Sequence, residues 1–225
     1  THVHRKFSRI ARGWMPKLAA LGTPLLDAEK AGEALDIVFG WFARQSPATA
    51  GVLFPALPAA GPTAVLIRAR AQSLRLEIRD FDAHQRAALP SAACGGRPPE
   101  SMISTKKMKE LRRQRRQLEE RGAVTWVSAT KTGDVRVAFE KFLALESNGW
   151  KGKAGTALVS DPAVATFGRS MTRLLADDCL CRIDALELDG RPVAMGITII
   201  SGRSAALWKI AYDEADRKST RLNSS

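Results

Sequence analysis

Apolar and polar residues recur along the second half of the chain with two different periods. Residues 134–147 and 162–175 place apolar side chains at the spacing of an amphipathic helix. Asp161 followed by Pro162 strengthens the second helix start, because aspartate caps a helix and proline fits its first position. Residues 123–130 alternate as a strand does, and 180–189, 191–201 and 203–213 read as three further strands in quick succession.

The last three of these segments are separated by short polar pairs, Asp189-Gly190 and Ser201-Gly202, which favour tight hairpin turns. The pattern from 123 to 213 therefore predicts a strand, two helices and then an antiparallel meander of three strands. This order indicates an α+β fold rather than the repeated βαβ units of a dinucleotide-binding domain.

The first half of the chain is less regular. Asp27 is a candidate N-cap for a helix that begins at residue 28, and residues 63–72 are also expected to be helical. Residues 51–58 and 74–82 predict strands. Residues 84–100 contain Gly-Gly and Pro-Pro, so they are the best linker candidate.

A helix capped by Ser104 or Thr105 and ending at Gly122 follows the linker. These signals divide the chain into a first unit with its linker (1–100), a second unit (101–215) and a polar tail (216–225) that we expect to be non-native or disordered.

The formal net charge is +12, but it is concentrated in three short segments. Residues 106–121 hold eight basic and three acidic residues, and the other excesses lie in 1–17 and 216–225. A folded nucleic-acid surface would spread its cations among aromatic residues, so a nucleic-acid partner is not favoured, although tRNA stays open. The helix 106–121 presents either a solvated face or a surface for an anionic partner: an acyl-carrier protein, a polysaccharide, RNA or a membrane surface.

Three cysteines, Cys94, Cys179 and Cys181, suggest reduced thiols and a cytoplasmic protein. We expect buried structural thiols and no metal site, since further ligands at zinc spacing are lacking. No stretch approaches the roughly 20 apolar residues that span a bilayer.

Three pieces of the sequence, FLALESNGWKGKAGTAL, LELDGRPVAMGITII and ALWKIAYDE, resemble the FemAB-like, CelD-like branch of the GNAT acyltransferase superfamily. The resemblance covers roughly residues 15–215. It implies the GNAT-like acyl-CoA N-acyltransferase fold, with a mixed, mostly antiparallel sheet flanked by helices, in tandem units whose first and last parts are missing here.

The activity that this resemblance implies is transfer of an acyl group from acetyl-CoA or another acyl-CoA to an amine or hydroxyl acceptor, in exopolysaccharide or cell-envelope biosynthesis. The alternatives are an aminoacyl-tRNA-dependent relative and a non-catalytic module that binds RNA or another anionic ligand.

The resemblance also assigns roles to the end of the strand 203–213. Backbone groups of Ile210, Ala211 and Tyr212 would face the acyl-CoA. In this fold a tyrosine can protonate the leaving thiolate; its usual position is farther along the chain, and Tyr212, the only tyrosine in this sequence, is the candidate here. Asp213 and Glu214 would accept the acceptor's proton through water. The alternatives are a tyrosine half-buried against the core and two solvated turn carboxylates.

The glycine-rich stretch 145–158 is placed by the resemblance on the acceptor side of the cleft. Trp150 would form a wall, Lys151 and Lys153 would contact an anionic group, and Gly152 would supply permissive backbone. A nucleotide P-loop is excluded, because Ala154 stands where a serine or threonine should hold magnesium. A tryptophan packed under a glycine turn, with both lysines in water, remains the alternative.

The family pattern would continue after Glu214 with a loop and helix for the CoA pyrophosphate. The sequence reads ADRKSTRLNSS instead. We therefore expect a truncated piece of a longer enzyme that binds acyl-CoA poorly by itself.

Overall fold

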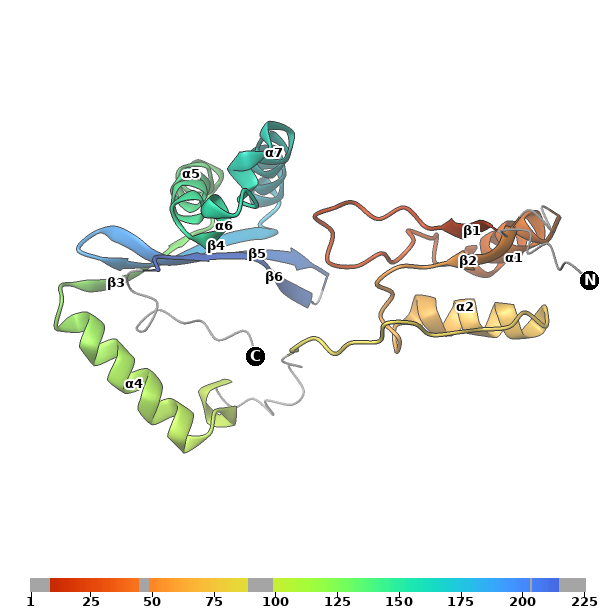
Figure 1. Ribbon diagram of the computed structural model, residues 1–225, viewed down its shortest axis with the longest axis horizontal. Helices are drawn as coiled ribbons and strands as arrows, with labels where there is room; N and C mark the ends of the chain where they lie inside the picture. The colour runs from red at the N-terminus through yellow and green to blue at the C-terminus, as the bar shows by residue number, and fades with distance from the viewer. Residues whose placement is uncertain (1–8, 45–48, 89–98, 203, 215–225) are drawn as a thin grey trace, which may run out of the picture. The chain divides into compact units, whose positions relative to one another are not determined.

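A computed structural model describes residues 9–44, 49–88, 99–202 and 204–214 of this chain (Figure 1). The chain divides into two compact units, residues 1–85 and 86–225. Each unit is described by itself. The domain boundaries expected from the sequence, and the pairing of two similar units, stay predictions.

The first unit contains two short parallel strands, β1 (Arg9–Arg12) and β2 (Thr49–Leu53), and two helices, α1 (Ala31–Arg44) and α2 (Pro62–Ser73). The prediction of a helix over 63–72 is confirmed. The expected helix start directly after Asp27 is wrong. The Asp27 carboxylate accepts hydrogen bonds from the amides of Glu29 (2.9 Å) and Lys30 (3.1 Å), which forms a turn, and α1 begins at Ala31.

The strand expected over 74–82 is also wrong, since these residues have no regular secondary structure. Arg75 and Asp82 adopt positive φ angles of 54° and 53°, which interrupt an extended conformation. Alternation of apolar residues is not sufficient for a strand, because a strand also needs a neighbour that satisfies its backbone groups.

The second unit follows the predicted order of elements. After the short helix η1 (Pro99–Met102) and α4 (Thr105–Glu119) come β3 (Val124–Ala129), α5 (Thr132–Asn148), α6 (Trp150–Lys153), η2 (Leu158–Ser160) and α7 (Pro162–Asp177). The meander consists of β4 (Cys181–Leu188), β5 (Arg191–Ser201) and β6 (Ser204–Tyr212). The four strands form an antiparallel sheet in the order β3-β4-β5-β6, and Figure 1 shows α5, α6 and α7 over one face of it. The α+β prediction is confirmed.

Local signals account for the ends of several elements. Ser104 caps α4 by accepting a hydrogen bond from the amide of Lys107, and Asp161 caps α7 through the amides of Ala163 and Val164. Asp189 and Gly190 both adopt positive φ angles, 51° and 75°, as a type I′ hairpin turn requires.

The buried face of α7 differs from the one that its large apolar residues predicted. Phe167 and Leu174 are more than half exposed, and the buried positions are occupied by small residues: Ala165, Gly168, Thr172 and Ala176. At Gly168 an added Cβ would lie 2.7 Å from the ring of Phe139 on α5. The phenylalanine ring therefore takes the volume that a side chain on α7 would otherwise fill, and the two helices pack closely.

The opposite face of the sheet is contacted by the C-terminal part of α4, where Leu118 packs with Leu188 and Val193. The expectation of buried thiols is half right. Cys181 is buried, but Cys179 is exposed in the turn after α7 at a φ of 58°. Among the described residues, no helix is long and apolar enough to cross a membrane.

Candidate functional site

The glycine-rich stretch forms a compact connection between α5 and α7. Gly152 is required by a close approach, because a Cβ at this position would lie 1.7 Å from the carbonyl oxygen of Ser147. Gly155 adopts a φ of 66°, where a residue without a side chain is favoured. At Gly149 neither a close approach nor a positive φ requires glycine, since an added Cβ would make only ordinary contacts. Two of the three glycines therefore fold the chain back onto the end of α5.

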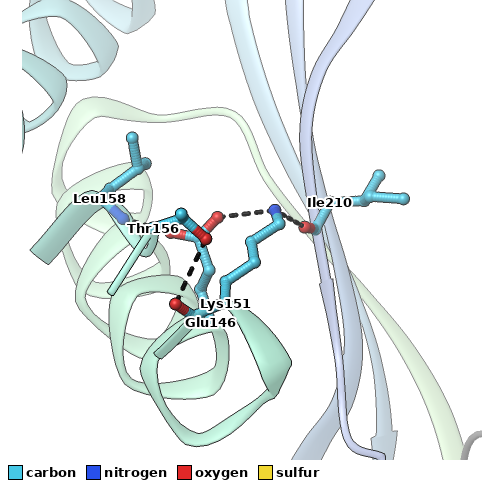
Figure 2. Close-up of polar contacts among 5 residues, drawn as sticks. All are labelled: Glu146, Lys151, Thr156, Leu158 and Ile210. Carbon is cyan, nitrogen blue, oxygen red and sulfur yellow. Dashed lines mark hydrogen bonds and ion pairs between the residues drawn. The ribbon is translucent and has the colours of Figure 1, made fainter. Parts of the chain in front are cut away.

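An ion pair lies inside this connection. The Lys151 ammonium is 2.8 Å from Oε1 of Glu146 and donates to the backbone carbonyl of Ile210 on β6 at 2.9 Å (Figure 2). The second oxygen of Glu146 accepts the amide of Leu158 at 2.7 Å. The side chain of Glu146 is only 2% exposed and that of Lys151 is 21% exposed. We call these two side chains, with their bond to the Ile210 carbonyl, the Glu146–Lys151 clamp.

The backbone of Lys151 is fixed as well. Its carbonyl oxygen accepts the amides of Thr156 (2.8 Å) and Ala157 (3.1 Å) and the hydroxyl of Thr156 (3.3 Å). Both ends of Lys151 are therefore held by defined partners, which places its ammonium at a fixed point over the edge of the sheet (Figure 2).

The end of β6 meets this connection at further points. The Lys153 ammonium lies 3.2 Å from a carboxylate oxygen of Glu214. The backbone of Gly149 lies beside the carbonyl oxygen of Tyr212, which would be 3.6 Å from an added Cβ. Asp213 pairs instead with Arg191 on β5 at 2.9 Å. The structure thus brings together most of the two residue sets singled out in the sequence, one from 150–153 and the other from 210–214.

The direction of the backbone groups on β6 follows from its pairing with β5. The Asp213 amide donates to the carbonyl of Val193 at 2.8 Å, so residue 213 forms inward hydrogen bonds. In an antiparallel ladder inward and outward residues alternate. The N–H and C=O groups of Tyr212 and Ile210 therefore point away from β5, and within the described residues no further strand pairs with β6. Ala211, in contrast, faces its partner Met195 on β5.

The exposure of the predicted side chains divides them into two groups. Trp150 is half exposed and Lys153 is 74% exposed, so both can contact a bound molecule. Tyr212 is half-buried at the strand end. The Lys151 ammonium is already bonded to Glu146 and Ile210. The sequence predicted either a contact from this ammonium to an anionic substrate or a lysine in water, and the observed bonding differs from both. Its role toward any ligand stays a proposal.

Glu146 was not singled out in the sequence, although a signal for it exists. It lies on the same face of α5 as the buried residues Val135, Phe139 and Phe142. A carboxylate at an apolar position of an amphipathic helix indicates a buried polar contact, because an unpaired charge is costly to bury. What the helix pattern could not indicate was the partner.

The basic run of the sequence lies on α4. Lys106, Lys109 and Arg113 line a shallow hollow on this helix together with Thr105 and Glu110. Hydrogen bonds from Arg113 lower the pKa of Glu110 from 4.5 to about 2. An anionic partner for this helix stays a prediction. In the part of the chain that the structure describes, no group of three or more histidine, cysteine, aspartate or glutamate residues is arranged to hold a metal ion.

Comparison with known protein families gives one match. The family model described as acetyltransferase (GNAT) domain matches residues 105–221, just over half of the chain. The matched segment contains α4, the four-stranded sheet and the whole connection between α5 and α7. No curated protein and no solved structure matches the chain.

Proposed function

Because the chain belongs to the acetyltransferase (GNAT) domain family, we propose that its second unit transfers an acetyl or other acyl group from acyl-CoA to an amine or hydroxyl acceptor. Membership of this family supports acyl transfer in general. The FemAB-like and CelD-like relationship, an acceptor from exopolysaccharide or cell-envelope biosynthesis and a cytoplasmic location are the finer parts of the proposal, and they rest on the sequence resemblance.

The observation that carries the proposal is the contact between the 146–158 connection and the end of β6. Acyl transfer requires the acceptor and the thioester to be held in one place in attack geometry. The outward amide of Ile210 and the outward amide and carbonyl of Tyr212 offer donors and an acceptor to the acyl-CoA arm, while the Ile210 carbonyl is bonded by Lys151. Lys153 pairs with Glu214 just after β6 and offers a cation to the acceptor, and Trp150, half exposed at the start of α6, offers a wall.

The carboxylates at the end of β6 supply the proton chemistry in this proposal. Glu214 is 30% exposed in its pair with Lys153, so water can reach it, and it accepts the proton of the attacking amine or hydroxyl through that water. Asp213 is the second candidate base, although it is held by Arg191. The hydroxyl of Tyr212 protonates the thiolate that leaves when the thioester C–S bond breaks and the new acyl bond forms.

The test is an acetyl-transfer assay on the purified full-length protein, with release of free CoA thiol as the readout and a panel of amines and hydroxyl compounds as acceptors. We expect CoA release that depends on the acceptor. A protein that neither binds acetyl-CoA nor releases CoA with any acceptor would refute the proposal.

A matched pair of tryptophan variants tests the acceptor wall. Trp150→Ala should raise the KM of the acceptor several-fold more than that of acetyl-CoA, because it removes a contact on the acceptor side only. Trp126→Ala is the control, since Trp126 is also largely exposed but lies on β3. An unchanged acceptor KM in Trp150→Ala would return this residue to a packing role.

A further inference from the structure

We propose that Lys151 is a positioning residue for the acyl donor, and that Glu146 holds it in this role. This inference rests on the proposed function and adds to it a residue that acts through the backbone of β6. Lys151 would not touch the reacting atoms. It would set where the outward-pointing peptide groups of β6 lie when the acyl-CoA arm arrives.

The position of Ile210 makes such a device necessary. β6 is the last strand in the sheet order of the described structure, so its outward carbonyl and amide groups lack the strand partner that an inner strand has. An unpaired strand edge is free to fray or to pair with another chain. In this structure the Lys151 ammonium bonds the outward carbonyl of Ile210 at 2.9 Å and so holds the edge near its end.

The clamp is built to keep the ammonium in one place. Glu146 receives Lys151 on one carboxylate oxygen and the Leu158 amide on the other, so the carboxylate cannot rotate without losing a bond. Its burial strengthens the ion pair, since water does not compete for it. A lysine whose purpose was only to pair with Glu146 would not need its second bond to β6.

The consequence for a bound acyl-CoA follows from spacing along the strand. Ile210 and Tyr212 are the two outward residues at the end of β6, and their peptide groups are the ones that the arm of the acyl donor would meet. With the carbonyl of Ile210 fixed, the neighbouring outward groups at Tyr212 are held in register. Binding then requires less ordering of the strand, which lowers the cost of association.

The experiment removes the clamp without leaving a charge buried alone. The double variant E146Q/K151M keeps an acceptor for the Leu158 amide and loses both charges, whereas K151R keeps a cation that can reach both partners. E140Q/R169M is the control, because it removes another ion pair of α5, one that joins this helix to α7 rather than to β6. Acetyl-CoA affinity, by calorimetry, and amide hydrogen exchange are both measured on the full-length protein.

In E146Q/K151M we expect the Asp213 amide, which donates to Val193, to exchange about tenfold faster. We also expect the Kd for acetyl-CoA to rise about tenfold. A tenfold change corresponds to the loss of about one charge-assisted hydrogen bond. The amide of Ile200, which donates to Leu180 at the far end of β5, should be unchanged. K151R should stay close to wild type in both measurements, and E140Q/R169M should show neither effect.

The outcomes separate the two proposals. A wild-type protein without affinity for acetyl-CoA would refute the proposed function. A wild-type protein that binds acetyl-CoA while E146Q/K151M binds it equally well, or leaves the Asp213 amide equally protected, would overturn the role of Lys151. That role would also be overturned if E140Q/R169M weakened binding as much, since the effect would then be one of general stability.

Discussion

Replacing Gly152 by alanine tests the geometry of the glycine-rich connection directly. The added Cβ would lie 1.7 Å from the Ser147 carbonyl oxygen and 2.5 Å from its carbon, whereas real Cβ contacts are essentially never shorter than 3.0 Å. Both atoms belong to the backbone at the end of α5, so no side-chain rotation relieves the overlap. The two backbone segments must separate by about 1.3 Å, the difference between 3.0 and 1.7 Å.

The free energy of this change is estimated from what the shift disrupts. Lys151 precedes Gly152, and its bonds of 2.8 and 2.9 Å would stretch beyond hydrogen-bond length if α6 moved by that amount. Overpacking a tight site costs about 1–3 kcal/mol, and a buried charge that loses its partner costs about 3–5 kcal/mol. Because partial relaxation reduces both costs, we expect Gly152→Ala to destabilise the second unit by about 3 kcal/mol.

Thermal and urea unfolding, followed by circular dichroism, measure this loss. For a unit of this size about 3 kcal/mol corresponds to a Tm lower by roughly 10 °C. Gly133→Ala is the matched control, since Gly133 lies in α5 and an added Cβ meets nothing within 4 Å. Alanine there should be neutral or stabilise by up to about 1 kcal/mol. A Gly152→Ala protein that melts within about 2 °C of wild type would refute the reasoning.

Two further predictions use the pKa shifts. Burial raises the pKa of Cys181 to about 11. In a Cys94→Ser background at pH 8, a thiol reagent should therefore label the exposed Cys179 rapidly and Cys181 only after denaturation. Rapid labelling of both cysteines would contradict the buried position of Cys181. Arg113 lowers the pKa of Glu110 to about 2, so the contribution of this pair is present above pH 4.5 and is lost as the pH falls towards 2. A carboxyl NMR titration should show that midpoint in wild type and a higher one in Arg113→Met, which stays below 4.5 because Gln114 still donates to Glu110, whereas a wild-type midpoint near 4.5 would contradict the pairing.

Elements whose signals are local were predicted well from the sequence. Ser104 and Asp161 cap helices through amides two or three residues away, and Asp189-Gly190 needs only its own backbone angles to make a hairpin. The order of strands and helices in the second unit followed from such signals and from periodicity. In each case the decisive interaction lies within a few residues of the signal.

Features that depend on distant partners were missed. Residues 74–82 alternate as a strand does, but no neighbouring strand in the described structure pairs with them. The apolar spacing of 162–175 includes Phe167, but this side chain is half exposed, and the ring of Phe139 takes the space beside Gly168. At the candidate site the short stretch 150–153 was recognised as a unit, but the bond from Lys151 to Ile210 joins residues 59 positions apart and leaves no local pattern.

Because of the bond from Lys151 to Ile210, the glycine-rich connection cannot be moved into another protein by itself. Its bond from Leu158 to Glu146 closes over 12 residues, but Lys151 finds its second partner only on β6. The bond from Lys151 to Ile210 can form only when β6 is in place, so the connection is complete only together with the end of the meander. A designer who moved this stretch into another scaffold would have to move the end of β6 with it, because one of the two bonds of the Lys151 ammonium is made to that strand.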